Sequence, residues 1–484
     1  MSIRNIIKVL SIVLLIIAGF MLIPLIMAYY LHETAPFKGF IITIALIIII
    51  SSIVLIIERN NKINDLTARD GFIFVTFAWI SASLFSCLPF IISKSIPSIT
   101  DAYFEAMSGY STTGASILID IEILPRSILF WRSLTHWLGG MGIVVLTVAI
   151  LPMLGIGGIQ LIKAEAPGPS MDKISPRISG TAKKLWYIYI GLTIIQTILL
   201  VAGKMSLFDA LTHTFGSLSG GGFSIKNKSV GHYDSAYIQG VITFFMLLGG
   251  MNFSLHYKFI TGKISQFLRD QELRVYILIF IISSLLITFN LMKHEVVSFN
   301  KGLQYSTFQV ASILTTTGFA TADYELWPYF SQTILFLIMF IGGCSGSTSG
   351  NIKVIRFMTL FKKGFNEMKY LLHPSGVFTL KVNGHTVRKD IAYAISGFFF
   401  LYILILLITT LVVSTADVDI VTSLTTSLAA LGNIGPGFGL IGPTENYHFF
   451  PAYVKWFLSL AMMIGRLELY TVLVLFTRTF WANR

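Results

Sequence analysis

The stretch ILTTTGFATADYE, residues 313–325, places three threonines and a glycine between two long apolar segments. Backbone N–H and C=O groups that lack partners cost several kcal/mol each in hydrocarbon, so irregular chain at bilayer depth must be buried in protein or line a watery path. This stretch decides the fold because the chain contains three others of the same kind.

The related stretches are STTGAS (111–116), SGGGFS (219–224) and GNIGPGFG (432–439). A segment of roughly ten to fourteen residues, too short to cross a bilayer, precedes each one. A longer apolar span follows, and it contains Gly139–Gly140, Gly249–Gly250, Gly342–Gly343 or, in the fourth copy, Gly465–Arg466. A single glycine would favour helix packing or a helix end. Four copies in one order instead predict four tandem units around one axis.

The composition predicts a membrane protein. Hydrophobic residues make up 54% of the chain, charged residues only 12%, and the mean hydropathy is +0.77. We predict ten spans, near residues 6–30, 37–57, 71–93, 127–154, 184–203, 235–257, 273–292, 327–357, 388–414 and 450–477. The first resembles a signal peptide, but its apolar core is too long, and we interpret it as a retained helix.

The formal charge of +12 is distributed as in a membrane protein. Lys and Arg gather in alternate connections, at 4–8, 59–69, 160–184, 257–274 and 351–389. This pattern predicts that both termini and these loops are cytoplasmic. No basic patch alternates with base-stacking aromatics, so we expect no nucleic-acid partner. Cys87 and Cys344 lie in apolar segments and are predicted to be buried small side chains.

The repeated unit suits cation transport. Rings of backbone carbonyl oxygens can replace the water shell of a cation. Glycine permits the backbone angles that such a ring needs and keeps side chains out of the path. The C-terminal ends of the four short helices would add partial negative charge. Asp101 and Asp209, each thirteen residues before a repeat glycine, are expected to cap two of these helices.

These motifs resemble the Trk/Ktr/HKT superfamily of potassium and sodium transporters, and the resemblance covers about residues 70–484. Four further motifs contribute to it, namely WLGGMGIVVL (137–146), GGMNFSLHY (249–257), GGCSGSTSGNIK (342–353) and GRLE (465–468). Two extra N-terminal helices are similar to the bacterial Trk uptake branch. The resemblance implies an all-α integral membrane protein of the bacterial inner membrane. It also implies a homodimer with one pore per chain, contact with membrane lipid, and a cytosolic nucleotide-binding regulatory subunit, a TrkA-like ring.

The resemblance divides the chain into an N-terminal two-helix extension (1–66) and four pore units, at 67–160, 181–260, 270–357 and 386–484. It implies that potassium is bound by carbonyls of Thr112, Thr113, Gly220, Gly221, Thr316, Thr317, Asn433 and Ile434, followed by Gly114, Gly222, Gly318 and Gly435. All four glycines favour potassium over sodium. Two departures from the family pattern imply that selectivity for potassium over sodium is modest. Gly220 stands where relatives tend to carry a bulkier residue, and the fourth copy is less regular than the others.

A gate is expected below these residues. The segment 342–353 breaks the third unit with small and polar residues, which are expensive at membrane depth unless they face water or protein. We predict a gating loop that includes Gly342, Gly343, Ser345, Gly346, Ser347, Thr348, Ser349 and Gly350; the alternative is a helix-packing kink. Arg466 is a charge within the last span, and such charges usually have a function. We predict that it binds loop carbonyls, because Glu468, two residues away, would not share its helical face.

Several alternatives remain. His136, His213 and His256 could couple transport to protons, but structural roles are favoured, and an ion-coupled symporter of potassium with proton or sodium is the alternative function. External carboxylates could attract cations or act as caps, namely Asp101, Glu105, Asp209, Asp323 and Glu325. The chain lacks GxxxxGK[ST], and GIGGIQ (155–160) lacks the context of a dinucleotide site, so nucleotide control requires a partner. Segments 160–184 and 351–389 could dock that partner or anionic lipid. Enzyme motifs such as HExxH and GxSxG are missing, which predicts that the chain is not an enzyme.

Overall fold

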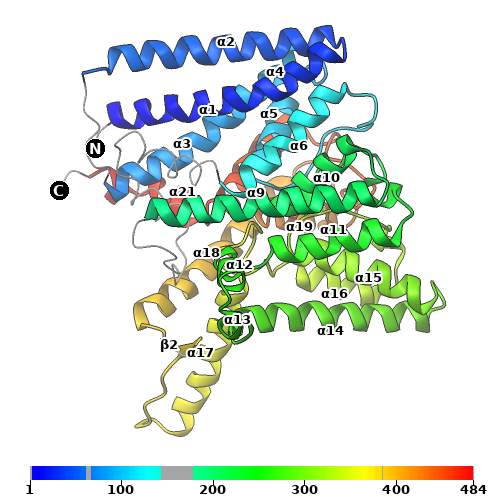
Figure 1. The fold of residues 1–484 in the computed structure, drawn as a ribbon. Helices are drawn as coiled ribbons and strands as arrows, with labels where there is room; N and C mark the ends of the chain where they lie inside the picture. Colours follow the sequence, from blue (N-terminus) through cyan, green and yellow to red (C-terminus); the bar gives the residue numbers. More distant parts are fainter. Residues whose placement is uncertain (1–2, 61–66, 143–177, 384, 483–484) are drawn as a thin grey trace.

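The computed structural model describes residues 3–60, 67–142, 178–383 and 385–482. Its long helices run roughly parallel, and α1 begins and α22 ends at the same end of the bundle (Figure 1). We call this the inner end and the opposite one the outer end. Within the described ranges, the only strands are β1 (Lys381–Val382) and β2 (His385–Thr386), which form a small antiparallel hairpin. The predicted all-α class is confirmed.

The helices follow the predicted order. The N-terminal extension is α1 (Ile3–Tyr30) and α2 (Thr34–Ile57). Unit 1 contains α3 (Ala68–Ser86), α4 (Leu88–Ile92), α5 (Ile99–Tyr110) and α6 (Arg126–Gly140). Unit 2 contains α9 (Ile178–Ala202), α10 (Leu207–Ser219), η2 (Ser229–His232), α11 (Ala236–Gly249) and α12 (Phe253–Ile260), and α13 (Ile264–Leu268) links it to unit 3.

Unit 3 contains α14 (Gln271–Lys293), α15 (Phe299–Leu314), η3 (Tyr324–Leu326), α16 (Tyr329–Ile338) and α17 (Val354–Leu372). Unit 4 contains α18 (Lys389–Ser414), α19 (Ile420–Leu431), α20 (Ala452–Arg466), α21 (Tyr470–Leu473), η4 (Val474–Phe476) and α22 (Arg478–Trp481). The short helices α5, α10, α15 and α19 are the predicted re-entrant segments. The exact unit boundaries stay a prediction; α17 runs beyond the expected end at residue 357.

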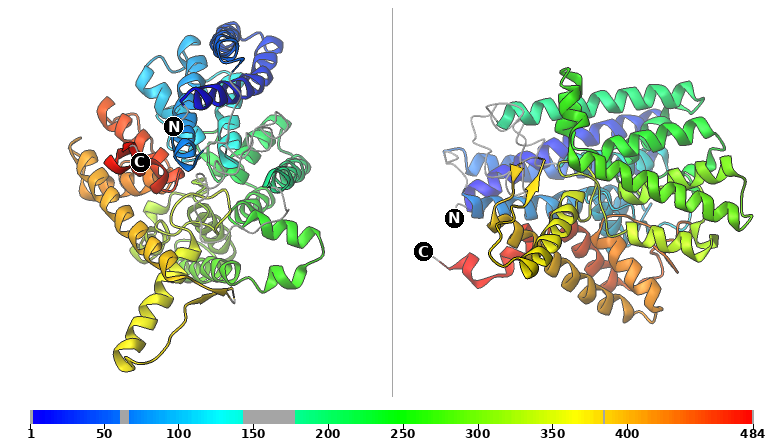
Figure 2. Two further views of the ribbon diagram at one scale, coloured as in Figure 1. Left: turned by 90° about the vertical axis from the view of Figure 1, so that its left-hand side faces the viewer. Right: turned by 90° about the horizontal axis from the view of Figure 1, so that it is seen from below.

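The four units surround a common centre. Seen from the inner end, the colours pass once around the molecule, from unit 1 in blue and cyan to unit 4 in orange and red (Figure 2). The second helix of one unit packs against the short helix of the next, because α6 contacts α10, α11 contacts α15, and α20 contacts α5. This arrangement brings the four short helices together around the centre.

The described residues include six helices that are long and apolar enough to cross a membrane, or up to eight if two bent pairs each count as one span. The predicted spans 235–257 and 450–477 are bent helix pairs in the structure. The chain bends by 101° between α11 and α12 and by 112° after α20. α6 ends at Gly140, and residues 143–154 of the predicted fourth span lie outside the described part. The break expected only in unit 3 therefore has counterparts in units 2 and 4.

Close packing explains the glycines at these breaks. A Cβ added at Gly139 would overlap the carbonyl oxygen of Tyr110, and one at Gly465 would overlap that of Leu431. At Gly249 the added Cβ would lie 3.0 Å from Leu218 O. Each of these carbonyls lies in the last turn of the short helix of the same unit. Glycine thus lets the second helix of units 1, 2 and 4 end directly against the short helix.

The capping prediction needs a correction. Ser98 and Ser206 are the N-cap residues of α5 and α10, and their side chains accept hydrogen bonds from the backbone N–H groups of Asp101 and Asp209. The two aspartates instead lie in the first helical turn, where negative charge still complements the helix dipole. Cys87 and Cys344 are buried free thiols, as the apolar context predicted.

Candidate functional site

Four segments with the same backbone meet at the centre of the molecule. Thr112, Gly220, Thr316 and Asn433 have φ angles of 53°, 68°, 55° and 54°. The glycines two residues later, Gly114, Gly222, Gly318 and Gly435, have φ angles of 80°, 75°, 80° and 94°. Positive φ is uncommon outside glycine, so four equivalent pairs indicate one repeated conformation. Gly220 has the same left-handed backbone as its counterparts, and glycine adopts that backbone without a steric penalty.

Each of these segments is tied to its own short helix in the same way. The backbone N–H groups of Thr113, Gly221, Thr317 and Ile434 donate to the carbonyl five residues earlier, over 2.8–2.9 Å. Units 1 and 3 each contain a pair of hydrogen-bonded hydroxyls. The side-chain oxygens of Ser111 and Thr113 lie 2.7 Å apart, and those of Thr315 and Thr317 lie 2.7 Å apart. The backbone of each segment is therefore fixed by the end of a helix.

The four segments form a closed ring. A Cβ added at Gly114 would overlap Gly221 O, one at Gly222 would overlap Thr317 O, and one at Gly318 would overlap Ile434 O. At Gly435 the added Cβ would lie 2.7 Å from Thr113 O, which returns the sequence of contacts to unit 1. We call residues 112–114, 220–222, 316–318 and 433–435 the ring. Its glycines allow each carbonyl to approach the neighbouring unit.

A buried ion pair supports two sides of the ring. Glu105 on α5 and Arg132 on α6 lie 2.6 Å apart, with 1% and 2% exposure. The Glu105 carboxylate also accepts from Ser116 Oγ and Ile117 N, and Arg132 donates to Ser224 O over 2.8 Å. These contacts hold the chain that leaves the ring in units 1 and 2.

This burial corrects the placement of Glu105 at the outer mouth. Its pairing with Arg132 was missed because the two residues are 27 positions apart on different helices. Other predicted outer carboxylates also have protein partners. Asp101 pairs with Lys455 over 2.6 Å, and Asp209 accepts from the Tyr233 hydroxyl over 2.9 Å. Glu325 accepts from Gly439 N, and its burial raises its pKa.

Residues 339–353 leave the helix after α16 and lie between units 2, 3 and 4. We call residues 342–353 the loop. Cys344 N donates to Gly250 O over 2.8 Å, and the Thr348 hydroxyl donates to Leu218 O over 2.8 Å. From unit 3, Glu272 accepts from the backbone N–H groups of Ser345 and Ile355, over 2.8 and 3.0 Å. From unit 4, the Tyr402 hydroxyl donates to the side chain of Asn351 over 2.9 Å.

Arg466 joins the loop to unit 1. Its guanidinium donates to Thr348 O over 2.6 Å, and to Gly139 O and Gly140 O over 2.7 and 2.9 Å. Arg466 occupies the place that the second glycine of the pair has in the other three units. Glu468 pairs with Arg356 on α17. The roles of Glu272, Arg356 and Tyr402 were not predictable, since each contacts residues distant in the chain.

Comparison with known proteins shows the family of the chain. The TrkH family model, described as a cation transport protein, matches residues 36–481. The chain belongs to the TrkH family. This membership confirms the predicted resemblance and the prediction that the chain is a transport protein rather than an enzyme. It also places the chain among multi-pass membrane proteins, as its apolar helices require.

Relatives match the TrkH-family chain over its whole length. The Trk system potassium uptake protein TrkH of Salmonella typhimurium is 39% identical and covers 99% of this chain and 100% of its own. The Trk system potassium uptake protein TrkI of Halomonas elongata is 36% identical, with coverage of 98% and 96%. The crystal structure of the potassium transporter TrkH from Vibrio parahaemolyticus matches with a TM-score of 0.89 and 36% identity, over 100% of both chains.

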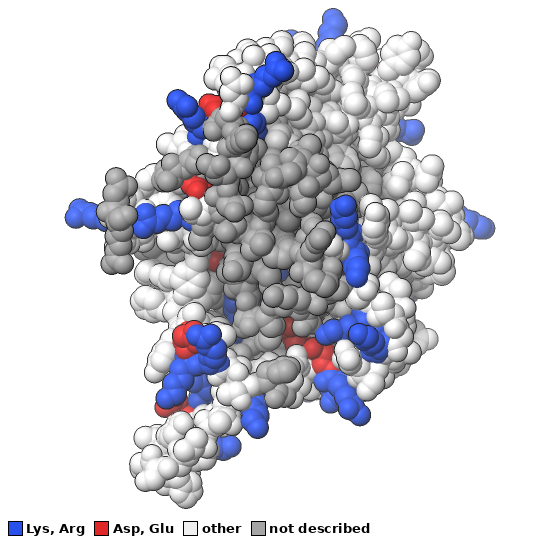
Figure 3. Space-filling view, turned by 60° about the vertical axis from the view of Figure 1, so that its left-hand side comes forward, with Lys and Arg blue, Asp and Glu red and all other residues white. Residues whose placement is uncertain are grey.

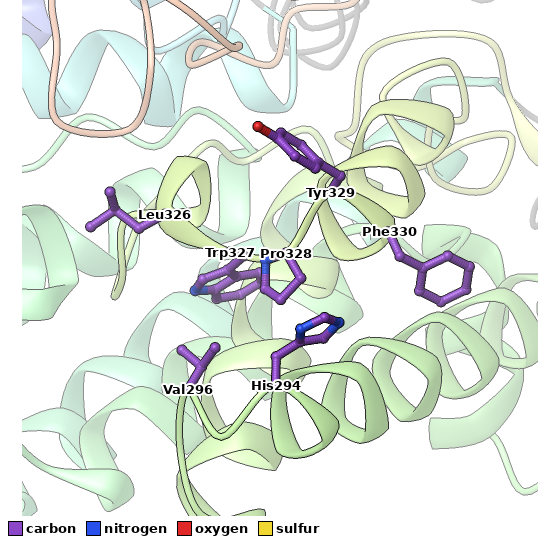
Figure 4. Close-up of a pocket in the computed structure, with 7 residues that line it drawn as sticks. All are labelled: His294, Val296, Leu326, Trp327, Pro328, Tyr329 and Phe330. Carbon is purple, nitrogen blue, oxygen red and sulfur yellow. The ribbon is translucent and has the colours of Figure 1, made fainter.

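Among the remaining candidate features, His136 packs against the ring, because a Cβ added at Gly221 would lie 2.5 Å from its imidazole. His136, His213 and His256 each donate a ring N–H to a backbone carbonyl over 2.8–3.0 Å. Figure 4 shows an open apolar pocket lined by His294, Trp327 and neighbouring residues, between the end of α14 and the start of α16. The described residues contain no cluster of His, Cys, Asp and Glu suited to a metal. The segments 155–160 and 160–177 lie outside the described residues.

Proposed function

We propose that this TrkH-family chain takes up potassium through the ring. The observation that carries the proposal is the closed sequence of contacts, in which a glycine of each unit meets a carbonyl of the next. Carbonyls of Thr112, Thr113, Gly220, Gly221, Thr316, Thr317, Asn433 and Ile434 would replace the water around the ion. The names of the relatives support potassium as the ion, and a ring of carbonyl dipoles suits a monovalent cation.

The selectivity proposal rests on backbone geometry. The third ring position is glycine in all four units, and Gly220 has the left-handed backbone of its counterparts. Because the backbone oxygen is the proposed ligand, the missing side chain at Gly220 leaves the ligand in place. We therefore expect potassium and rubidium to be preferred over sodium.

The loop is proposed as the gate. Loop residues touch the inner side of the ring, since a Cβ added at Gly220 would lie 3.7 Å from both Ser349 Cα and Thr348 O. Arg466 holds Thr348 and brings a positive charge to the same place. A fixed cation and a loop below the ring both oppose the passage of potassium while the loop is seated.

The proposed orientation puts the inner end in the cytoplasm of a bacterium, with the chain in the inner membrane. Lys and Arg gather on the face at this end, as Figure 3 shows, in agreement with the positive-inside rule. A cytosolic nucleotide-binding partner, a TrkA-like ring, would dock there. Exposed apolar side chains of α2, α14 and α18 face lipid or a second copy in a homodimer.

The first experiment is radioactive rubidium uptake into liposomes that contain the purified chain, in competition with potassium, sodium and lithium. Strong competition by potassium and weak competition by sodium is the expected result. Equal competition by sodium would contradict the selectivity proposal. Uptake that depends on a proton gradient at fixed membrane potential would instead favour ion-coupled symport, which no contact in the described structure favours.

The gate is tested with Arg466→Ala in the same liposomes. Because three charge-assisted hydrogen bonds are lost, we expect uptake without any activating partner to rise by about tenfold or more. Arg478→Ala removes an exposed charge from α22 and serves as the control. Unchanged uptake by Arg466→Ala would contradict the gating role.

A further inference from the structure

The loop makes a direct polar contact with one residue of the ring. The backbone N–H of Gly350 donates to the hydroxyl oxygen of Thr316 over 2.7 Å, and Thr316 has 0% exposure. A Cβ added at Gly350 would lie 2.6 Å from Gly432 O and 2.9 Å from the Cβ of Asn433. Residue 350 is therefore seated between ring segments of units 3 and 4, with its N–H directed at unit 3.

Unit 1 offers a matched position without this contact. Thr112 is the same residue type as Thr316, and their φ angles are 53° and 55°. The Thr112 hydroxyl is also buried, yet it has no hydrogen-bond partner among the described residues. At the two remaining equivalent positions the chain has Gly220 and Asn433, and neither can offer a hydroxyl. Thr316 is thus distinguished by its contact with the loop and not by its backbone.

We propose that the Thr316 hydroxyl is a positioning group that couples the loop to the ring. This inference rests on the proposed gate. In the seated loop, the Gly350 N–H has its acceptor on the ring, and a buried N–H without an acceptor is unfavourable. When the loop leaves, the Thr316 oxygen loses this donor and has its lone pairs free at the inner side of the ring. The Thr316 hydroxyl therefore accepts from Gly350 N only in the closed protein.

The test compares Thr316→Val with Thr112→Val. Valine keeps the branched shape and removes the hydroxyl, so the two variants differ mainly in the contact with Gly350. Rubidium uptake by each variant in liposomes, without any partner protein, is divided by uptake of the same variant carrying Arg466→Ala. This ratio corrects for any effect of the lost hydroxyl on conduction through the ring.

The ratio is expected to be about three- to tenfold higher for Thr316→Val than for Thr112→Val, the range that corresponds to one hydrogen bond. Thr316→Ser keeps the hydroxyl and should reverse most of the increase. Thr333→Val on the exposed surface of α16 should leave uptake unchanged. Equal ratios for the two valine variants would overturn the proposal, provided that Arg466→Ala alone raises uptake. If Arg466→Ala has no effect, the gate itself is wrong.

A change on the loop side gives an independent answer, also in case Thr316→Val fails to fold. Gly350→Ala should displace the loop, since its new Cβ would meet Gly432 O and Asn433. The same ratio of uptakes should rise about threefold or more, as expected for loss of one buried hydrogen bond. An unchanged ratio in a monodisperse Gly350→Ala protein would overturn the coupling even without the threonine variants.

Discussion

The ring and the loop lie against each other, yet they are built on opposite principles. The ring repeats one backbone conformation four times, with the same hydrogen bond from each segment to its short helix. Among the described residues the loop occurs once, and its contacts differ from unit to unit. Unit 2 contributes backbone carbonyls, and units 3 and 4 contribute the side chains of Glu272, Tyr402 and Arg466. Repetition gives equal distances around an axis, whereas single contacts can be released without disturbing that axis.

The comparison predicts the largest effect for a ring glycine. Gly318→Ala places a side chain at a φ of 80°, which costs about 1–2 kcal/mol, and its Cβ would overlap Ile434 O. We expect rubidium uptake to fall to background. The control is Gly240→Ala on α11, where an added Cβ has open space. Normal uptake by Gly318→Ala would mean that the ring does not need its close contacts.

The ion pair behind the ring should be next in size. Glu105→Gln leaves the Arg132 charge buried without its counter-ion, and breaking such a pair costs about 3–5 kcal/mol. We expect a clear loss of thermal stability and weaker discrimination of potassium from sodium. Asp390→Asn breaks an exposed pair with Arg388 and should cost under about 1 kcal/mol. Similar losses for both variants would show that the ring does not depend on Glu105.

A loop glycine should have the opposite functional effect to a ring glycine. Gly346 has a φ of 71°, and an added Cβ would lie 3.0 Å from the side-chain oxygen of Asn252. Gly346→Ala should destabilise the seated loop by about 1 kcal/mol and raise uptake without a partner by roughly fivefold. Gly262→Ala has the same backbone strain, at a φ of 77°, but no contact within 4 Å. A fall in uptake by Gly346→Ala would remove the distinction between ring and loop.

The smallest effect concerns the cap of α19, which supports the ring from outside. Hydrogen bonds from Thr422 and from Val421 N lower the pKa of Asp419 below its ordinary value of 3.8. The cap therefore stabilises the fold above that value, and the contribution is lost as pH falls through the lower pKa. Asp419→Ala should cost about 1 kcal/mol at pH 7. In thermal unfolding, the difference from the unchanged chain should shrink toward pH 3, and a constant difference would contradict the cap.

Repetition also decided what could be predicted from the sequence. Four glycine motifs in order predicted the ring, because each copy supported the interpretation of the others. The left-handed residue two positions before each repeat glycine was not predictable. Its place is taken by Thr112, Gly220, Thr316 and Asn433, and threonine rarely adopts positive φ. Gly220 was interpreted as a departure, although it is the residue with the least strain there.

Features that occur once were harder to predict. The hydropathy of 235–257 and 450–477 continues through the bends, so it did not indicate the turns after Gly249 and Arg466. Glu105 was assigned to the outer mouth because nothing in its neighbourhood in the chain identifies Arg132 as its partner. Arg466 was found because an isolated charge in an apolar span is conspicuous.

The single charge of Arg466 depends on the four units sharing one polypeptide. In an assembly of four identical subunits, one codon for arginine would place four guanidinium groups below the ring. Joining the four units in one polypeptide allows three of them to keep glycine at this place while one acquires the charge. A single polypeptide therefore allows one mutation to act on one quadrant alone.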